Sequence, residues 1–140
     1  MLLKVKKVHP DAPDLKRAHR NDSGYDLYAT TLVHDSIAYV EYGTGISIQL
    51  QEGTTGLICA RSSISKYDLD LANSIGVLDS SYTGEIRLRF RKLGLGLPVY
   101  KLGDKIGQLI IVRHDSPDFM YVQELDKTER GDGGFGSSGT

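Results

Sequence analysis

The stretch GEIRLRFRK (residues 84–92) alternates apolar and charged side chains without a break. Ile86, Leu88 and Phe90 fall on one side of the alternation, and three arginines fall on the other. Because successive side chains of a β-strand point to opposite faces, this pattern predicts a strand with one buried face. We expect the arginine face to be solvated and to discourage edge pairing. Anion binding and burial at a subunit contact are the alternatives.

Further β-type runs recur on both sides of this strand. They lie at residues 3–8, 36–50, 55–62, 73–86, 105–114 and 118–125. The run at 36–50 reads as two short strands around Gly43 and Gly45, and residues 62–71 are expected to form one short helix. Glycine and Asp, Asn or Ser clusters separate the runs at intervals of about 8–12 residues, a spacing typical of β-sandwiches and barrels. We therefore predict an all-β fold.

Composition limits the class of protein. The 140 residues suit one domain, and a net charge of −1 gives no field that would recruit nucleic acid. No apolar run predicts a membrane span or a signal peptide, so we expect a cytoplasmic or nuclear protein without a membrane partner. Cys59 is the single cysteine, which excludes an intrachain disulfide. Its apolar neighbours favour a buried structural role over a reactive thiol.

Residues 129–140 contain five glycines and one apolar side chain, Phe135. Such a segment cannot bury enough surface to fold alone, so we expect a core over residues 1–128 and a flexible arm over 129–140. The arm contains G-x-G-x-x-G, but no helix is predicted after it, as a dinucleotide-binding motif would need. An aromatic ring can stack on a base for about 1–3 kcal/mol, and glycine N–H groups can converge on an anion. The arm is either a lid for a nucleotide or a disordered linker.

Two polar segments of the core could bind phosphate. Arg61, Ser62 and Ser63 follow the expected strand GLICA (56–60), and an arginine fork with two hydroxyls can clamp a phosphate. The same serines could simply form a turn. Gln108 interrupts an apolar strand, so a partner or a ligand must satisfy its carboxamide.

Two carboxylates occupy positions at which chemistry is plausible. Asp79 stands where a strand gives way to a tight turn, and a carboxylate there can orient a water as general base. The alternative is an aspartate that caps the turn. Asp26 lies between a glycine turn and apolar residues, as a cap or as a holder of metal-bound water.

These segments together resemble the five ordered motifs of the trimeric deoxyuridine triphosphate nucleotidohydrolases, the dUTPases. In chain order they are SGYDLYA (23–29), ARSSIS (60–65), GVLDSSYTGEI (76–86, with Asn73 upstream), GDKIGQLI (103–110) and RGDGGFGSSGT (130–140). The resemblance implies a jelly-roll-like β core, in a barrel or sandwich arrangement, that forms a homotrimer. It also implies that the active sites draw residues from all three subunits and that each arm closes a neighbour's site.

The resemblance implies Mg²⁺-dependent hydrolysis of dUTP to dUMP and pyrophosphate, which limits uracil incorporation into DNA and supplies dUMP for thymidylate synthesis. Asp79 would orient a water for in-line attack on the α-phosphorus, and Asp26 would reach the Mg²⁺ through water. The family's phosphate contacts fall on Arg61, Ser62, Ser63, Gln108, Arg130, Ser137 and Ser138. Its uracil and deoxyribose contacts fall on Asn73, Gly76, Val77, Leu78, Tyr82, Phe135 and Gly136.

Specificity is expected to come from the backbone between Asn73 and Tyr82. A bound cytosine would leave the buried N–H and C=O groups of this backbone unpaired. The ring of Tyr82 would exclude a ribose 2′-hydroxyl. The sequence departs from the family's usual motifs at four places: Ser23, Ile64-Ser65, Lys105 and Gly107. A dCTP deaminase-like enzyme of the same fold, or a regulatory protein that binds a partner in a dUTP-dependent way, are the alternative functions.

Overall fold

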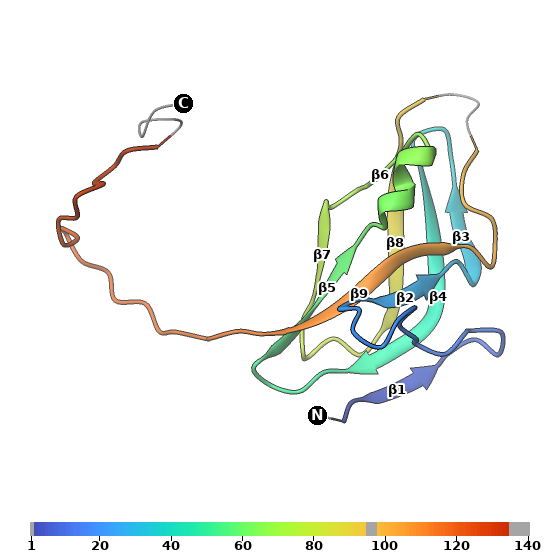
Figure 1. Ribbon diagram of the computed structural model, residues 1–140, viewed down its shortest axis with the longest axis horizontal. Coiled ribbons are helices and arrows are strands. Elements are labelled where there is room, and N and C mark those ends of the chain that lie inside the picture. Colours follow the sequence, from blue (N-terminus) through green and yellow to red (C-terminus); the bar gives the residue numbers. More distant parts are fainter. Residues whose placement is uncertain (1, 95–97, 135–140) are drawn as a thin grey trace.

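The computed structural model describes residues 2–94 and 98–134. Figure 1 shows two antiparallel sheets packed against each other. One sheet has the order β1-β4-β8-β6, with β3 also paired to β4, and the other has the order β2-β9-β5-β7. The strands are β1 (Lys4–Lys7), β2 (Tyr25–Tyr28), β3 (Thr31–Asp35), β4 (Tyr39–Gln49), β5 (Thr54–Cys59), β6 (Leu69–Leu71), β7 (Ile75–Leu78), β8 (Glu85–Lys92) and β9 (Lys105–Arg113). The predicted all-β fold is confirmed.

Strand β8 has the alternation that its sequence predicts. Ile86, Leu88 and Phe90 are buried in a core that both sheets share, whereas the arginine side chains face outward and are exposed. Arg89 Nη2 lies 2.6 Å from Glu41 Oε2, and Arg87 Nε lies 3.0 Å from Glu85 Oε2. The arginine face is therefore exposed in the single chain, and burial at a subunit contact stays an alternative. Glutamates pair with Arg87 and Arg89, and this compensation of charge does not favour anion binding.

Strand β4 is continuous where the sequence predicted two short runs. Its pairing with β8 is irregular between Gly43 and Ser47, where Gly45 adopts a φ of 69°. A side chain at Gly45 would place its Cβ 2.7 Å from Ala12 Cβ, so both the backbone and the packing require glycine there. This bulge bends β4, whose first half pairs with β3 and whose second half pairs with β1.

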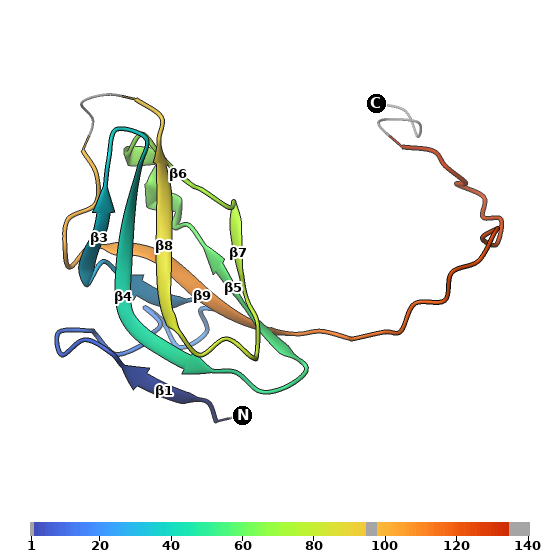
Figure 2. The same ribbon diagram turned by 180° about the vertical axis from the view of Figure 1, so that it is seen from behind.

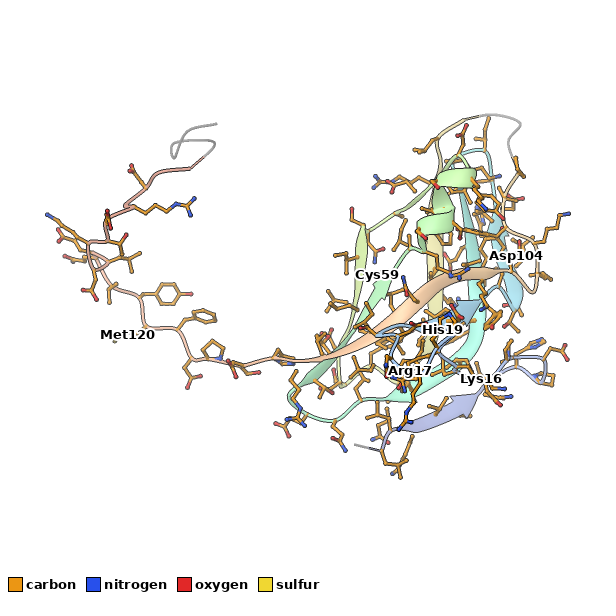
Figure 3. The ribbon with its side chains drawn as sticks, in the orientation of Figure 1. Lys16, Arg17, His19, Cys59, Asp104 and Met120 are labelled. Carbon is orange, nitrogen blue, oxygen red and sulfur yellow. The ribbon has the colours of Figure 1, made fainter. Side chains whose placement is uncertain are left out.

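Two other segments differ from expectation. Residues 62–71 do not form one helix: a 3₁₀ turn, η1 (Ser62–Lys66), precedes strand β6. The strand predicted at 118–125 is not formed within this chain. Residues 114–134, the C-terminal segment, leave the sheets after β9 and run away from the core (Figures 1 and 2). Phe119, Met120 and Tyr121 are more than 80% exposed, and Figure 3 shows Met120 far from the sheets.

A strand needs a neighbour for its N–H and C=O groups, and residues 118–125 pair with no strand among the described residues of their own chain. The sheets end at Arg113, and the division into core and arm at 128/129 stays a prediction. No helix in the described part of the chain is long and apolar enough to span a membrane.

An aromatic cluster fills the core beside the loop that leads into β9. Tyr42 Oη donates a 2.6 Å hydrogen bond to the backbone oxygen of Tyr100, and the Tyr100 ring also contacts Phe90 and Tyr67. Burial raises the pKa of both Tyr42 and Tyr100 to about 12. The Tyr100 hydroxyl is buried without a hydrogen-bond partner among the described residues.

We predict opposite effects for two matched substitutions in this cluster. Tyr42→Phe should lower the free energy of unfolding by about 1 kcal/mol, because it removes a hydrogen bond and leaves a buried carbonyl unpaired. Tyr100→Phe should leave that free energy unchanged or raise it, because it removes an unpaired hydroxyl. Urea unfolding at neutral pH measures both, and an equal loss in the two variants would contradict the hydrogen-bond assignment.

The same tyrosines predict an alkaline loss of stability. Their pKa is about 10 in the unfolded chain and about 12 in the fold, so the fold favours the neutral phenol. Their contribution is complete below pH 10 and falls as the pH rises toward 12. Urea midpoints measured across that range should fall less steeply for Tyr42→Phe than for the unmodified protein. Parallel curves would show that Tyr42 is not the group responsible.

Candidate functional site

Three neighbouring strands place the predicted phosphate-binding groups at one end of the four-stranded sheet. Gln108 on β9 is the register partner of Asp26 on β2 and of Cys59 on β5. Cys59, labelled in Figure 3, is the last residue of β5, and Arg61 follows it by two residues. Asp26, Gln108 and Arg61 are therefore brought together although they lie far apart in the sequence. Cys59 is half-buried, less enclosed than predicted.

These residues line a polar cavity of about 330 Å³. Its described lining consists of Ala18, Asp22, Ser23, Gly24, Asp26, Arg61, Ser62, Gln108 and Ile110. A guanidinium, hydroxyls and a carboxamide around one opening suit an anion with several oxygens. Ser63 lies in η1 and is not part of this lining. A larger groove of about 530 Å³ adjoins the cavity, but Val5, Ile48 and Leu109 give it an apolar floor.

Asp26 is the charged group that organises the cavity. It is 8% exposed, and its two oxygens contact different cations: Oδ2 lies 2.6 Å from Lys105 Nζ, and Oδ1 lies 3.4 Å from Arg61 Nε. The hydrogen bond from Lys105 to Asp26 raises the pKa of Lys105, which keeps the ammonium charged. The sequence pattern identified Lys105 only as a departure from the usual motif, so its role as the partner of Asp26 was missed.

The carboxylates around the cavity can be tested against a Mg²⁺ ion. No group of three or more His, Cys, Asp or Glu residues that could hold a metal occurs in the part of the chain that the structure describes. Magnesium commonly keeps several waters and binds through one or two carboxylates plus substrate phosphates. Asp26 retains free lone pairs beside its two cation contacts. The residues therefore fit an ion held through water and phosphate, but not a closed protein cage.

The second predicted half of the site lies along β7. This strand is at the edge of its sheet in the described residues, so one row of its N–H and C=O groups has no strand partner. Gly76 packs closely on β5, since a Cβ there would lie 3.0 Å from Ile58 Cβ. The turn before β7 holds Ser74 at a φ of 60°, a strained conformation that the sequence did not reveal. Val77 is exposed and Leu78 is buried.

Asp79 lies just past β7 and is exposed. Its backbone oxygen accepts a 3.0 Å hydrogen bond from the N–H of Tyr82, which closes the turn that the sequence predicts. Register places Ile75 beside Cys59, in the row that contains Gln108 and Asp26. Asp79 is four residues further along, about 13 Å at the rise of a β-strand.

This spacing separates the two predicted halves of the site within one chain. Asp79 does not line the polar cavity, and a general base must lie within hydrogen-bond reach of the proton that it accepts. Arg130 belongs to the C-terminal segment, which runs away from the sheets in Figure 2. Its Nε donates a 2.9 Å hydrogen bond to the backbone oxygen of Gly133. Phe135, Gly136, Ser137 and Ser138 lie outside the described residues.

Comparison with known proteins identifies the class. The dUTPase family profile matches residues 10–139. The deoxyuridine 5′-triphosphate nucleotidohydrolase of Corynebacterium efficiens is 41% identical, over 98% of this chain and 77% of its own length. The enzyme of that name from Escherichia phage T5 is 34% identical, over 99% of both chains. A mutant dUTPase of Staphylococcus bacteriophage 80alpha, solved with dUpNHpp, superposes with a TM-score of 0.84 at 27% identity over 99% of both chains. The chain belongs to the dUTPase family.

Gly24 offers a test of the polar cavity. A Cβ at this position would overlap Gln108 Oε1 and lie 3.0 Å from the Gln108 carboxamide carbon. We expect Gly24→Ala to displace that carboxamide and to weaken nucleoside triphosphate binding by about tenfold, the cost of roughly one hydrogen bond to a charged group.

Calorimetry with a non-hydrolysable triphosphate measures the effect. Gln108→Ala should cause a similar loss, and Gly24→Ala should add little to it in the double variant. Full affinity in Gly24→Ala would show that the Gln108 carboxamide is not a phosphate ligand.

Proposed function

We propose that this chain hydrolyses dUTP to dUMP and pyrophosphate, with Mg²⁺ as its cofactor. The observation that carries the proposal is the polar cavity in which Asp26, Arg61 and Gln108 converge. It has the size and the chemistry for a phosphate chain, and it is built from three of the segments that resemble dUTPase motifs. Membership of the family supports the substrate.

The reaction requires one nucleophile and one base. A water held by the Asp79 carboxylate gives up a proton to it as the water oxygen bonds to the α-phosphorus. The bond between the α-phosphorus and the oxygen that bridges to the β-phosphorus breaks, and pyrophosphate leaves with that oxygen. Arg61, Ser62, Ser63 and Gln108 bind the phosphates, so that their donors meet the charge that moves onto the leaving group.

Magnesium, when bound through the phosphates and through water on Asp26, would neutralise charge on the triphosphate. Asp26 itself stays fixed by Lys105 and Arg61, and this pairing holds the Arg61 guanidinium at the opening of the cavity. The contribution of the chain to phosphate binding is therefore an arrangement of charges that its own ion pairs hold in place.

The separation of Asp79 from the polar cavity supports a site shared between subunits. Because one chain keeps them about 13 Å apart along the strands, we assign the Asp79 of a second chain to each cavity. We take the assembly to be a homotrimer, as the resemblance implies, with Arg130 and the arm residues Phe135, Gly136, Ser137 and Ser138 supplied by a subunit's C-terminal arm. The exposed apolar side chains of residues 119–125 are consistent with contacts to another chain.

Uracil recognition is assigned to the edge of β7. Backbone N–H and C=O groups from Asn73 to Leu78 can pair with the edge of the base, and Gly76 allows close approach. A cytosine would present the opposite donor and acceptor pattern at these positions. Phe135 would cover the base, and Tyr82 would pack under the deoxyribose.

Neither alternative function is favoured by the comparisons. An assay of pyrophosphate and ammonia release from dUTP, dCTP, UTP and dTTP with Mg²⁺ decides among them. We expect pyrophosphate from dUTP at a rate far above that from the other three. Ammonia from dCTP, with dUTP untouched, would instead identify a deaminase.

Asp79→Asn should reduce turnover of dUTP by at least about a thousandfold, because the base is lost while the shape of the site is kept. Binding of a non-hydrolysable dUTP analogue should stay within a few-fold of normal. Loss of binding together with turnover would assign Asp79 a structural role.

Deletion of residues 130–140 should leave the oligomer folded and its thermal midpoint unchanged, because the described part of this segment is exposed. Turnover of dUTP should fall by at least about a hundredfold, since the phosphate donors and the ring over the base are removed. Light scattering and kinetics measure the two effects separately. A truncated enzyme with normal turnover would rule out the role of the arm as a lid.

A further inference from the structure

The side chain of Tyr82 is held in one place although it is 46% exposed. Its hydroxyl donates a 2.9 Å hydrogen bond to the backbone oxygen of Glu85. The ring lies directly over Gly84: a Cβ built on that glycine would be 2.5 Å from Tyr82 Oη, 2.6 Å from Cζ and 3.0 Å from Cε2. Gly84 has no positive φ, so the space above it, rather than its backbone conformation, requires glycine.

The acceptor of this hydrogen bond is anchored in the sheet. Glu85 pairs with Ser47 at the bulge of β4, where its Oε1 accepts a 2.9 Å hydrogen bond from the N–H of Gly45. Its Oε2 lies 3.0 Å from Arg87 Nε. The position of the Tyr82 ring is thus coupled, through Glu85, to the bulge of β4 in the sheet that contains β4 and β8.

A ring whose hydroxyl is already bonded to the backbone offers its face, and not its hydroxyl, to a ligand. We infer that Gly84 is a positioning residue that determines specificity. The absence of a Cβ at Gly84 lets the Tyr82 ring pack directly against the backbone, in the position that leaves room for a 2′-deoxyribose but not for the 2′-hydroxyl of a ribose. This inference rests on the proposed function, in which the Tyr82 ring packs under the sugar.

An alanine at position 84 would force the ring away. Ordinary contact between a Cβ and a ring carbon begins near 3.4 Å, so the ring must move outward by about 1 Å, and the hydrogen bond to Glu85 is then lost. The displaced ring packs less well on deoxyribose and no longer stands where it blocks the 2′-hydroxyl. Discrimination should fall even though no atom that reacts has been changed.

The test compares kcat/KM for dUTP and for UTP in four proteins: unmodified, Gly84→Ala, Tyr82→Ala and the double variant. We expect Gly84→Ala to lower the ratio of the two values by at least about tenfold, mainly through KM for dUTP and gained turnover of UTP. Tyr82→Ala should lower the ratio similarly. In the double variant the ring is absent, so the Gly84→Ala change should have no further effect. Thr83→Ala, an exposed neighbour in the same turn, should leave the ratio unchanged.

Each outcome distinguishes the inference from the function on which it rests. An unmodified protein that releases no pyrophosphate from dUTP contradicts the proposed function. An active protein whose ratio is unchanged by Gly84→Ala contradicts the inference alone. If Gly84→Ala unfolds the protein, the double variant decides: recovery of the thermal midpoint supports the clash with Tyr82, and no recovery shows that Gly84 serves only the connection between β7 and β8.

Discussion

The hydrogen-bond register of the four-stranded sheet is the constraint on which the rest of the site depends. It aligns Ile75, Cys59, Gln108 and Asp26 in one row across β7, β5, β9 and β2. The polar cavity forms at that end of the sheet, and Asp79, past the other end of β7, cannot reach it. A shift of one residue between β2 and β9 would place Gln108 and Asp26 on opposite faces of the sheet, so the register of this pair also keeps the two side chains together.

Ion pairs and close packing then fix the side chains of the candidate site in position. The carboxylate of Asp26 is buried between Lys105 and Arg61, and it holds the Arg61 guanidinium at the cavity. On the opposite sheet, Glu85 holds the bulge of β4 and carries the acceptor for Tyr82. Glycines at positions 24 and 84 leave room for the side chains of Gln108 and Tyr82, respectively. Each half of the proposed site is therefore ordered by contacts within one chain, and we assign the joining of the two halves to subunit assembly.

Much of the fold and part of the candidate site could be predicted from local sequence patterns. The alternation in β8, the strand that contains Gln108 and the turn that contains Asp79 follow from period and turn chemistry, and the segments that resemble dUTPase motifs point to Arg61 and Asp26. Other features depend on three-dimensional contacts that no local pattern shows. The bulge at Gly45 is set by Ala12 and Glu85, the role of Lys105 by a contact with Asp26 79 residues away, and the role of Gly84 by a ring two residues before it. The strand expected at 118–125 does not form because no strand edge in the described part of its own chain pairs with it.

The central claim is that Asp79 of one subunit serves the Arg61 cavity of another, and subunit mixing tests it most directly. Asp79→Asn and Arg61→Gln chains, each nearly inactive alone, are unfolded together in equal amounts, refolded and assayed with dUTP. A shared site combines an intact Asp79 with an intact Arg61 in one of four pairings, so the account predicts recovery of about a quarter of normal activity. Activity no higher than the mean of the two separate variants would show that each chain builds its site alone.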